Sequence, residues 1–163
     1  LLQDTKWGSL EGLVVDLPPG TGDEVLTIAQ RTKPQIAVVV TTPQEVALLD
    51  ARRAINFARK LEIPTIGVVE NMSGLACPHC GGRIDLFGRG GGEREAARQQ
   101  VVYFGAIPID PQAREAGDSG RPVVLNDPQG PTTSAFLAVA SRIAEAAALR
   151  DASAQAEADT PQP

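Results

Sequence analysis

The sequence is poor in several residue types, and each shortage argues against a class of protein. Aromatic residues make up 4% of the chain, and there are one histidine and two cysteines. Two cysteines cannot build a disulfide framework, so we expect a reducing, cytoplasmic compartment. No apolar run approaches the ~18 residues that a membrane-spanning helix requires, and no signal peptide opens the chain, so we expect no membrane partner.

Basic residues are also outnumbered. The 163 residues include 15 Lys and Arg against 20 Asp and Glu, a formal net charge of −5. A sequence-independent nucleic-acid binder needs a basic surface that displaces counterions, so we expect no nucleic-acid partner. Apolar residues account for 42% of the chain, as in a globular domain. Leu1 opens the sequence and Met72 is its only methionine, so we expect the chain to be part of a longer protein.

Four short apolar runs predict β-strands: Leu13–Asp16, Ile36–Val40, Thr65–Val69 and Val101–Ile107. Their apolar residues are continuous rather than alternating, which indicates strands covered on both faces in a mostly parallel sheet. Helical patterns lie around them, over residues 24–31, 42–60, 93–100 and 132–149. Strands that alternate with helices predict an α/β, doubly wound architecture, with functional loops at the carboxyl ends of the strands.

Local signals refine two of these helices. Thr42 as N-cap and Pro43 in the first turn predict where the second helix begins. Four residues are expected to point from it toward the sheet: Val46, Leu49, Ala54 and Phe57. The last helix has an apolar stripe of Phe136, Val139, Ala140, Ile143 and Ala147. After Arg150 little remains to bury, so we predict one domain over residues 1–150 and a disordered acidic tail over 151–163.

The first apolar run ends in Asp16, a pattern typical of a Walker B strand. A carboxylate at a strand tip can hold Mg²⁺ beside nucleotide phosphates, or it can simply cap a turn. The loop Pro18–Asp23 follows, and its glycines let the backbone approach a ligand closely. Val25 stands where a dinucleotide-binding loop would need its third glycine, which excludes that motif. The sequence also contains no Gly-Lys-[ST] phosphate loop, because its only lysines are Lys6, Lys33 and Lys60.

The run Cys77-Pro78-His79-Cys80 presents two thiols at a spacing that lets both bind one metal ion or cluster. A thiol–disulfide exchange site favours a first cysteine at a helix N-terminus, whereas glycines follow this motif at once. A structural zinc site needs four ligands, more than this segment offers. Two such pairs in a symmetric dimer would supply four thiolates, which suits a [4Fe–4S] cluster or a zinc ion. Two idle surface thiols remain the alternative, and residues 88–92 predict a pliant, glycine-rich loop nearby.

Taken in order, several segments resemble the Mrp/ApbC branch of the MinD/ParA-type P-loop ATPases, which are iron–sulfur cluster carriers of the bacterial cytoplasm. These segments are Leu13–Asp23, Thr41–Gln44, Gly67–Ser73, Cys77–Gly81 and Gly105–Asp110, within residues 7–124. The resemblance implies a homodimeric ATPase that binds ATP with Mg²⁺ and passes a labile [4Fe–4S] cluster to apo-proteins. The chain lacks the N-terminal part of that fold, including its phosphate loop. We therefore expect ATP hydrolysis from the full-length parent and not from this segment.

The resemblance also assigns roles by position. Asp16 matches the Walker B carboxylate that serves catalysis and Mg²⁺. The cluster would be held by Cys77 and Cys80. Nucleotide-contacting positions are Gly20, Thr21 and Gly22 near the γ-phosphate, Asn71 at the adenine, and Pro108, Ile109 and Asp110 beside the base. Asn71 could instead cap a turn, and Pro108 could end a strand.

Two other functions of the protein stay open, namely a MinD/ParA-like positioning ATPase and a zinc-linked dimer. The former is disfavoured because residues 132–149 form no basic amphipathic helix.

Overall fold

The computed structural model describes residues 4–18, 22–77 and 79–158. These residues form a parallel sheet flanked by helices and a separate two-stranded hairpin. In chain order the elements are α1 (Asp23–Thr32), β1 (Ile36–Thr41), α2 (Glu45–Lys60), β2 (Thr65–Glu70), β3 (Leu75–Ala76), β4 (Arg83–Ile84), α3 (Gly91–Gln99), β5 (Val102–Ala106), α4 (Pro111–Asp118), α5 (Val123–Asn126) and α6 (Pro131–Ala158).

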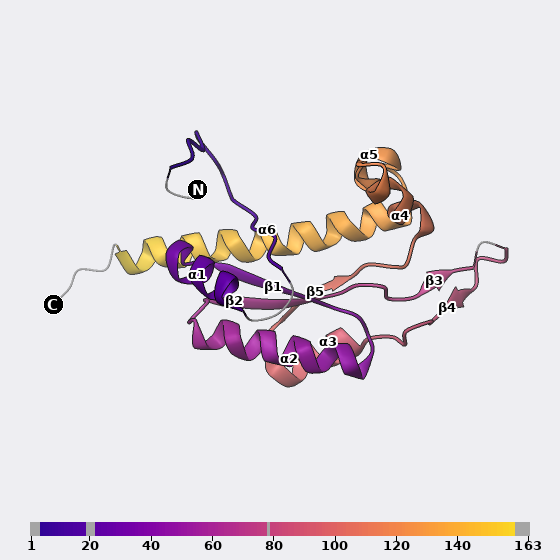
Figure 1. Ribbon diagram of the computed structural model, residues 1–163, viewed down its shortest axis with the longest axis horizontal. Helices are drawn as coiled ribbons and strands as arrows, with labels where there is room; N and C mark the ends of the chain where they lie inside the picture. Colours follow the sequence, from indigo (N-terminus) through magenta and orange to yellow (C-terminus); the bar gives the residue numbers. More distant parts are fainter. Residues whose placement is uncertain (1–3, 19–21, 78, 159–163) are drawn as a thin grey trace.

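The sheet has the strand order β1-β2-β5, and both of its pairings are parallel. Helices α2 and α3 cover one of its faces, and α6 covers the other (Figure 1). Parallel strands with helices on both faces confirm the predicted α/β architecture. The carboxyl ends of the three strands lie at one edge, where the β3–β4 hairpin projects away from the sheet (Figure 1).

The central strand β2 is buried along nearly its whole length because the core lies on both sides of it. Ile66 and Val68 belong to the cluster under α2 and α3, while Val69 packs with Phe104 on the α6 side. A Cβ atom at Gly67 would lie 2.1 Å from the ring of Phe104, so only glycine fits beside that fully buried ring. The continuous apolar run therefore identified the strand that is covered on both faces.

The segment Leu13–Asp16, predicted as the first strand, has no regular secondary structure, and the side chain of Val14 is 96% exposed. An apolar segment becomes a strand only where a neighbour takes its backbone hydrogen bonds. Strand β1 pairs with β2 on one side, and within the described ranges no strand lies beside residues 13–16. The prediction of a strand here was wrong for want of a pairing partner.

The second helix begins at Glu45, after the Thr42 that the sequence predicted as its N-cap. The Thr42 hydroxyl donates to the Gln44 side chain, and Gln44 takes the N-cap position. Its buried face is Leu48, Ala51, Ile55 and Ala58. Of the predicted inward residues, Ala54 packs on the core and Phe57 is half-buried, whereas Val46 and Leu49 are exposed. The helix is thus rotated from the predicted orientation, because Ile55 and Ala58 meet the sheet.

Helix α6 is described as far as Ala158, through the segment that the sequence predicted to be disordered after residue 150. Val139 is buried and Ile143 packs against the same cluster, as expected from the predicted stripe. Phe136 and Ala140 are exposed instead, because Ala135 and Ala146 complete the inner face. Among the described residues, no helix combines the length and apolar character that a bilayer crossing would require.

A partly buried ion pair joins the two helices on the same face of the sheet. Glu95 of α3 is 1% exposed, and its two oxygens accept from Nε and Nη2 of Arg52 in α2, both at 2.8 Å. Gln99 donates a further bond to the carboxylate at 3.0 Å. The hydrogen bonds from Arg52 are the main reason that the pKa of Glu95 is lowered. Because the folded pKa lies below the unfolded one, Glu95 stabilises the fold above its ordinary pKa, and that contribution is lost as the pH falls through the folded value.

We therefore expect Glu95→Gln to lower the free energy of unfolding at pH 7 by about 2 kcal/mol, because a charge-assisted pair is replaced by a neutral contact. The difference between variant and parent should shrink as the pH falls below the ordinary carboxyl pKa. Urea unfolding at pH 7 and at a pH below that value measures both effects. Asp50→Asn is the control, since Asp50 pairs with Arg53 on the surface. Equal, pH-independent losses in the two variants would contradict this account.

Candidate functional site at the carboxyl edge of the sheet

The carboxyl ends of β2 and β5 continue side by side beyond the sheet. The Ile107 amide donates to the Glu70 carbonyl at 2.8 Å, and the Ser73 amide donates to the Ile107 carbonyl at 2.9 Å. The Ile109 amide then donates to the Gly74 carbonyl at 2.7 Å. These bonds bring the segment that contains Asn71 next to residues 107–109. The structure thus places together two segments that the sequence predicted to contact a nucleotide base.

Among the described residues, the side chain of Asn71 makes one local hydrogen bond through its oxygen and leaves its amide nitrogen available. Its backbone amide donates to the Thr41 carbonyl at 2.7 Å, and its Oδ1 accepts from the Met72 amide at 2.8 Å. Met72 has a φ of 56°, so this side-chain bond supports a left-handed backbone conformation. Asn71 therefore caps a turn, which is one of the two predicted roles. Within the described ranges its amide nitrogen has no hydrogen bond, so a donor remains for a ligand.

The second base-flanking segment is also partly structural. Pro108 and Ile109 are half-buried, and Ile109 forms a parallel bridge with Leu75. Asp110 is the N-cap of α4, where its Oδ1 accepts from the Gln112 amide at 2.8 Å and Pro111 fills the first turn. The family resemblance implied a ligand role for Asp110, but an Asp directly before a Pro is also a signal of a helix N-terminus.

The candidate phosphate-side residues come from the N-terminal segment. Asp16 is exposed, and no hydrogen bond or ion pair joins it to another residue of the described ranges. Gly20 and Thr21 lie outside the described residues. Gly22 is the N-cap of α1, and its carbonyl accepts from the Leu26 amide at 3.2 Å. Within the described ranges, no hydrogen bond or ion pair joins Asp16 to the Asn71 segment.

Both cysteines lie in the loop between β3 and β4. The hairpin that these strands form projects beyond the helices that flank the sheet (Figure 1). The Cys77 amide donates to the Gly82 carbonyl at 2.8 Å, and the Gly81 amide donates back to the Cys77 carbonyl at 2.9 Å. Gly81 has a φ of 70°, which a residue with a side chain rarely adopts. Cys80 is exposed and Cys77 is half-buried. Cys77 thus begins a tight hairpin loop rather than a helix.

The hairpin loop favours the thiolate form of Cys77. The backbone amides of His79 and Cys80 hydrogen-bond to its sulfur, and together with the Cys80 thiol they lower the pKa of Cys77. The thiolate is the form of cysteine that ligates metals. Among the described residues, no group of three or more His, Cys, Asp or Glu side chains is placed to hold a metal ion. The chain therefore offers two sulfur ligands on an exposed projection.

Sequence reasoning did not single out Glu70, the last residue of β2. It is 1% exposed, and its carboxyl oxygens accept from the Ser73 hydroxyl at 2.6 Å and from the amides of Gly90 and Gly92 at 3.0 and 2.7 Å. A carboxylate after an apolar strand, the same signal that marked Asp16, could have identified it. Glu70 anchors the start of α3 and the turn that leads to the cysteine hairpin.

The glycines of the 88–92 stretch are not a uniformly pliant loop. A Cβ atom at Gly91 would lie 2.2 Å from the Pro43 carbonyl oxygen, and one at Gly92 would lie 3.0 Å from the Glu70 Cβ. Both residues are buried at the start of α3. These glycines permit close packing of the helix end against the carboxyl edge of the sheet, so the predicted pliancy was wrong for them.

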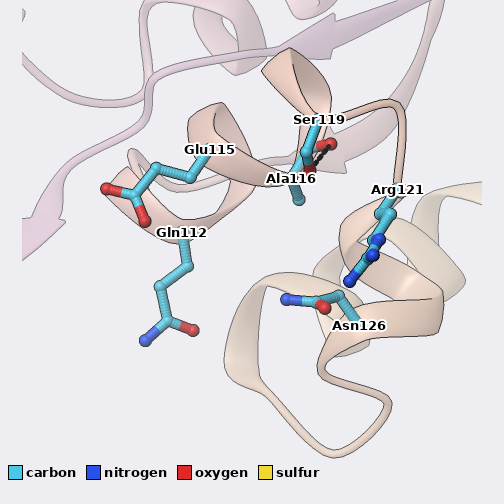
Figure 2. Close-up of a pocket in the computed structure, with 6 residues that line it drawn as sticks. All are labelled: Gln112, Glu115, Ala116, Ser119, Arg121 and Asn126. Atoms are coloured by element: carbon cyan, nitrogen blue, oxygen red, sulfur yellow. Dashed lines mark hydrogen bonds between the residues drawn. The ribbon is translucent and has the colours of Figure 1, made fainter.

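A hollow of about 270 Å³ lies between α4 and α5, next to this edge. Figure 2 shows Arg121 and Asn126 on one side and Gln112 and Glu115 on the other. Ala116 and Ser119 complete its lining, and the Ser119 hydroxyl donates to the Ala116 carbonyl at 3.0 Å. None of the predicted ligand residues that the structure describes lines this hollow.

Comparison with known proteins gives consistent matches. Residues 1–144 match the family model described as "ParA: NUBPL iron-transfer P-loop NTPase". The chain is 54% identical over 143 residues to the iron-sulfur cluster carrier protein of Pyrococcus horikoshii, covering 88% of this chain and 48% of that protein. It is 43% identical to the iron-sulfur cluster transfer protein NUBPL of Dictyostelium discoideum, with 88% and 44% covered. The chain thus spans about half the length of these relatives.

Two solved structures are similar in fold. A nucleotide-binding protein from Archaeoglobus fulgidus, solved in complex with ADP, superposes with a TM-score of 0.62 at 42% identity, covering 71% of this chain and 47% of that one. The MinD cell division protein of Aquifex aeolicus gives a TM-score of 0.53 at 22% identity, over 68% of this chain and 44% of that one. The second likeness concerns the fold alone.

Proposed function

The chain belongs to the ParA/NUBPL family of iron-transfer P-loop NTPases, and we propose that it carries an iron–sulfur cluster as cargo between proteins. The observation that supports this most is the pair of cysteines at the tip of an exposed hairpin. Cys80 is exposed and Cys77 is half-buried, and backbone amides favour the thiolate of Cys77. An exposed site with few ligands per chain suits delivery of a cluster better than its permanent storage.

The cargo that fits these ligands is a [4Fe–4S] cluster shared by two copies of the chain. A cubane cluster takes four cysteine thiolates, each chain offers two, and a two-fold axis supplies the other pair. The projection of the hairpin beyond the helices supports this arrangement, since two tips can meet without a collision between the bodies of the subunits (Figure 1). The acceptors are apo-proteins that need such a cluster, and the reducing cytoplasm is the compartment that suits exposed thiols.

Nucleotide binding belongs to the carboxyl edge of the sheet. In the proposed complex, the Asn71 amide donates to the adenine, and Pro108 to Asp110 line the base. Asp16 would supply an oxygen to Mg²⁺, a cation that prefers carboxylate and water ligands, and Gly20, Thr21 and Gly22 would serve the γ-phosphate. The likeness to a structure solved with ADP supports nucleotide binding by this family of chains. In the complete NTPase domain, ATP hydrolysis would either drive cluster transfer or control when the cluster is released.

The direct test is transfer itself. The protein, loaded anaerobically with iron and sulfide, is mixed with an apo [4Fe–4S] hydro-lyase, and recovery of the acceptor's activity is followed in the presence of an iron chelator. Activation faster than that produced by free iron and sulfide supports the proposal. Activation at the rate of the free ions, or blocked fully by the chelator, contradicts it. The two alternative functions, a positioning ATPase and a zinc-linked dimer, both predict that no acceptor is activated.

This chain by itself is expected to show no ATP hydrolysis. It has no Gly-Lys-[ST] sequence to hold the β- and γ-phosphates, and P-loop enzymes depend on that loop to position the transferred phosphate. Phosphate release measured against a protein-free blank tests this. Turnover above the blank that disappears in Asp16→Ala would contradict it. In a longer form that carries the loop, the same substitution should abolish hydrolysis while the thermal unfolding midpoint stays unchanged, since Asp16 is exposed.

Substitution of Asn71 should change base selectivity. In a form that carries the phosphate loop, Asn71→Asp removes the amide donor but keeps the oxygen that accepts from Met72. We expect ATP binding to weaken by about 1–3 kcal/mol relative to a nucleotide whose base does not use this bond. Calorimetric titration with ATP and CTP measures the difference. Equal losses for both nucleotides would mean that Asn71 only shapes the turn.

A further inference from the structure

The cysteine hairpin, residues 75–77 and 79–84, packs very little of its surface against the hydrophobic core. Described residues 79–89 are all exposed, and each hairpin strand contains two residues. Isolated two-stranded hairpins of this size are marginal in water, because little apolar surface is buried. The direction in which the hairpin points must therefore be set by specific polar contacts at its root.

Arg83 provides such contacts from the returning strand. Its Nη2 donates to the Ser73 carbonyl at 3.1 Å, and its Nε donates to Asp85 Oδ1 at 2.8 Å. The guanidinium lies directly against the backbone of Gly74, since a Cβ atom there would be 2.8 Å from Nε. Gly74 also has a φ of 79°, which favours glycine for a second reason. One side chain thus ties β4 to the turn that joins β2 to β3.

The same turn is held on its other side by the neighbouring segment. The Ile109 amide donates to the Gly74 carbonyl at 2.7 Å, and Leu75 bridges to Ile109. At its start, Ser73 is bonded to the buried Glu70. The root of the hairpin is therefore fixed to the rigid edge of the sheet, and Arg83 fixes the hairpin to that root.

We propose that Arg83 is a positioning residue that sets the direction of the cysteine hairpin, so that Cys77 and Cys80 of two subunits meet in the geometry that a shared cluster requires. The proposal rests on the proposed function, because it takes the two cysteines as cluster ligands. Arg83 and Asp85 are 45% and 40% exposed, so their ion pair contributes little to global stability. The planar fork of arginine reaches two acceptors at once, whereas lysine offers a single point charge.

The test compares Arg83→Ala and Arg83→Lys with the parent protein and with Arg53→Ala. Arg53 is the matched control, since it pairs with Asp50 on the exposed surface of α2. After anaerobic loading with iron and sulfide, the rate of cluster loss to a ferrous chelator is followed by absorbance. We expect Arg83→Ala to lose its cluster about tenfold faster than the parent, Arg83→Lys to fall between them, and Arg53→Ala to match the parent. All four proteins should share one thermal unfolding midpoint.

A second readout needs no cluster. In the apo-protein, backbone NMR order parameters of residues 76, 77 and 79–84 should fall below about 0.6 in Arg83→Ala, while those of β2 stay near rigid values. Unchanged order parameters and an unchanged rate of cluster loss in Arg83→Ala would overturn the proposal. If the parent takes up no cluster, the proposed function fails, and the order parameters alone then decide whether Arg83 orients the hairpin.

Discussion

Cys77→Ala and Cys80→Ala are each expected to abolish the cluster and the cluster-dependent dimer together. A [4Fe–4S] cluster needs four thiolates, and removal of one cysteine per chain leaves two in the dimer. The cysteines lie on an exposed hairpin loop, so their substitution should leave the unfolding midpoint unchanged. Absorbance near 400 nm marks the cluster, and the native mass marks the dimer.

The matched control is His79→Ala, within the same loop. The side chain of His79 is exposed, and what this residue gives Cys77 is a bond from its backbone amide, which alanine retains. We therefore expect full cluster content in this variant. Loss of the cluster in His79→Ala, or its retention in either cysteine variant, would contradict the assignment of Cys77 and Cys80 as its protein ligands.

Gly91→Ala should destabilise the fold by about 3 kcal/mol, because overpacking against backbone cannot be relieved by a change of rotamer. The added methyl group would meet the Pro43 carbonyl oxygen at 2.2 Å and its Cα at 2.9 Å. Either α3 or the link from β1 to α2 must then move. Urea unfolding of the variant and the parent measures the difference in free energy.

Gly117→Ala is the corresponding control. Gly117 lies in α4, and a Cβ atom there would meet nothing within 4 Å. Alanine is favoured over glycine in a helix by up to about 1 kcal/mol, so this variant should be as stable as the parent or slightly more stable. Equal destabilisation in both variants would mean that the packing of Gly91 against Pro43 is not the cause.

The fold was predictable from sequence where local pattern and long-range packing agree. The continuous apolar run of β2 identified a strand that is buried on both faces. Helix α2 has apolar residues around more than one side, so the sequence could not tell that Ile55 and not Leu49 meets the sheet. The segment Leu13–Asp16 has the composition of a strand, but composition does not supply a neighbour for its hydrogen bonds.

Some local features of the candidate site were also predictable from sequence, whereas its long-range contacts were not. The spacing of Cys77 and Cys80 indicated shared ligation, and the glycines after them argued against a helix, in agreement with the hairpin loop. The contacts of Glu70 with Gly90 and Gly92 join residues twenty and more positions apart, which no local pattern reveals. For Asn71, a ligand role and a turn-capping role were both predicted as alternatives, and the structure shows a capping bond. For Asp110, only a ligand role was predicted, and the structure shows that its side chain caps α4.

The measurement that tests the central claim most directly is the metal and sulfide content of the protein, determined together with its native mass after anaerobic reconstitution. The account predicts a dimer with about two iron and two sulfide ions per chain, which is one cubane cluster held by the paired cysteines of both subunits. A monomer that carries a whole cluster, or a dimer that holds one zinc ion and no sulfide, would contradict it.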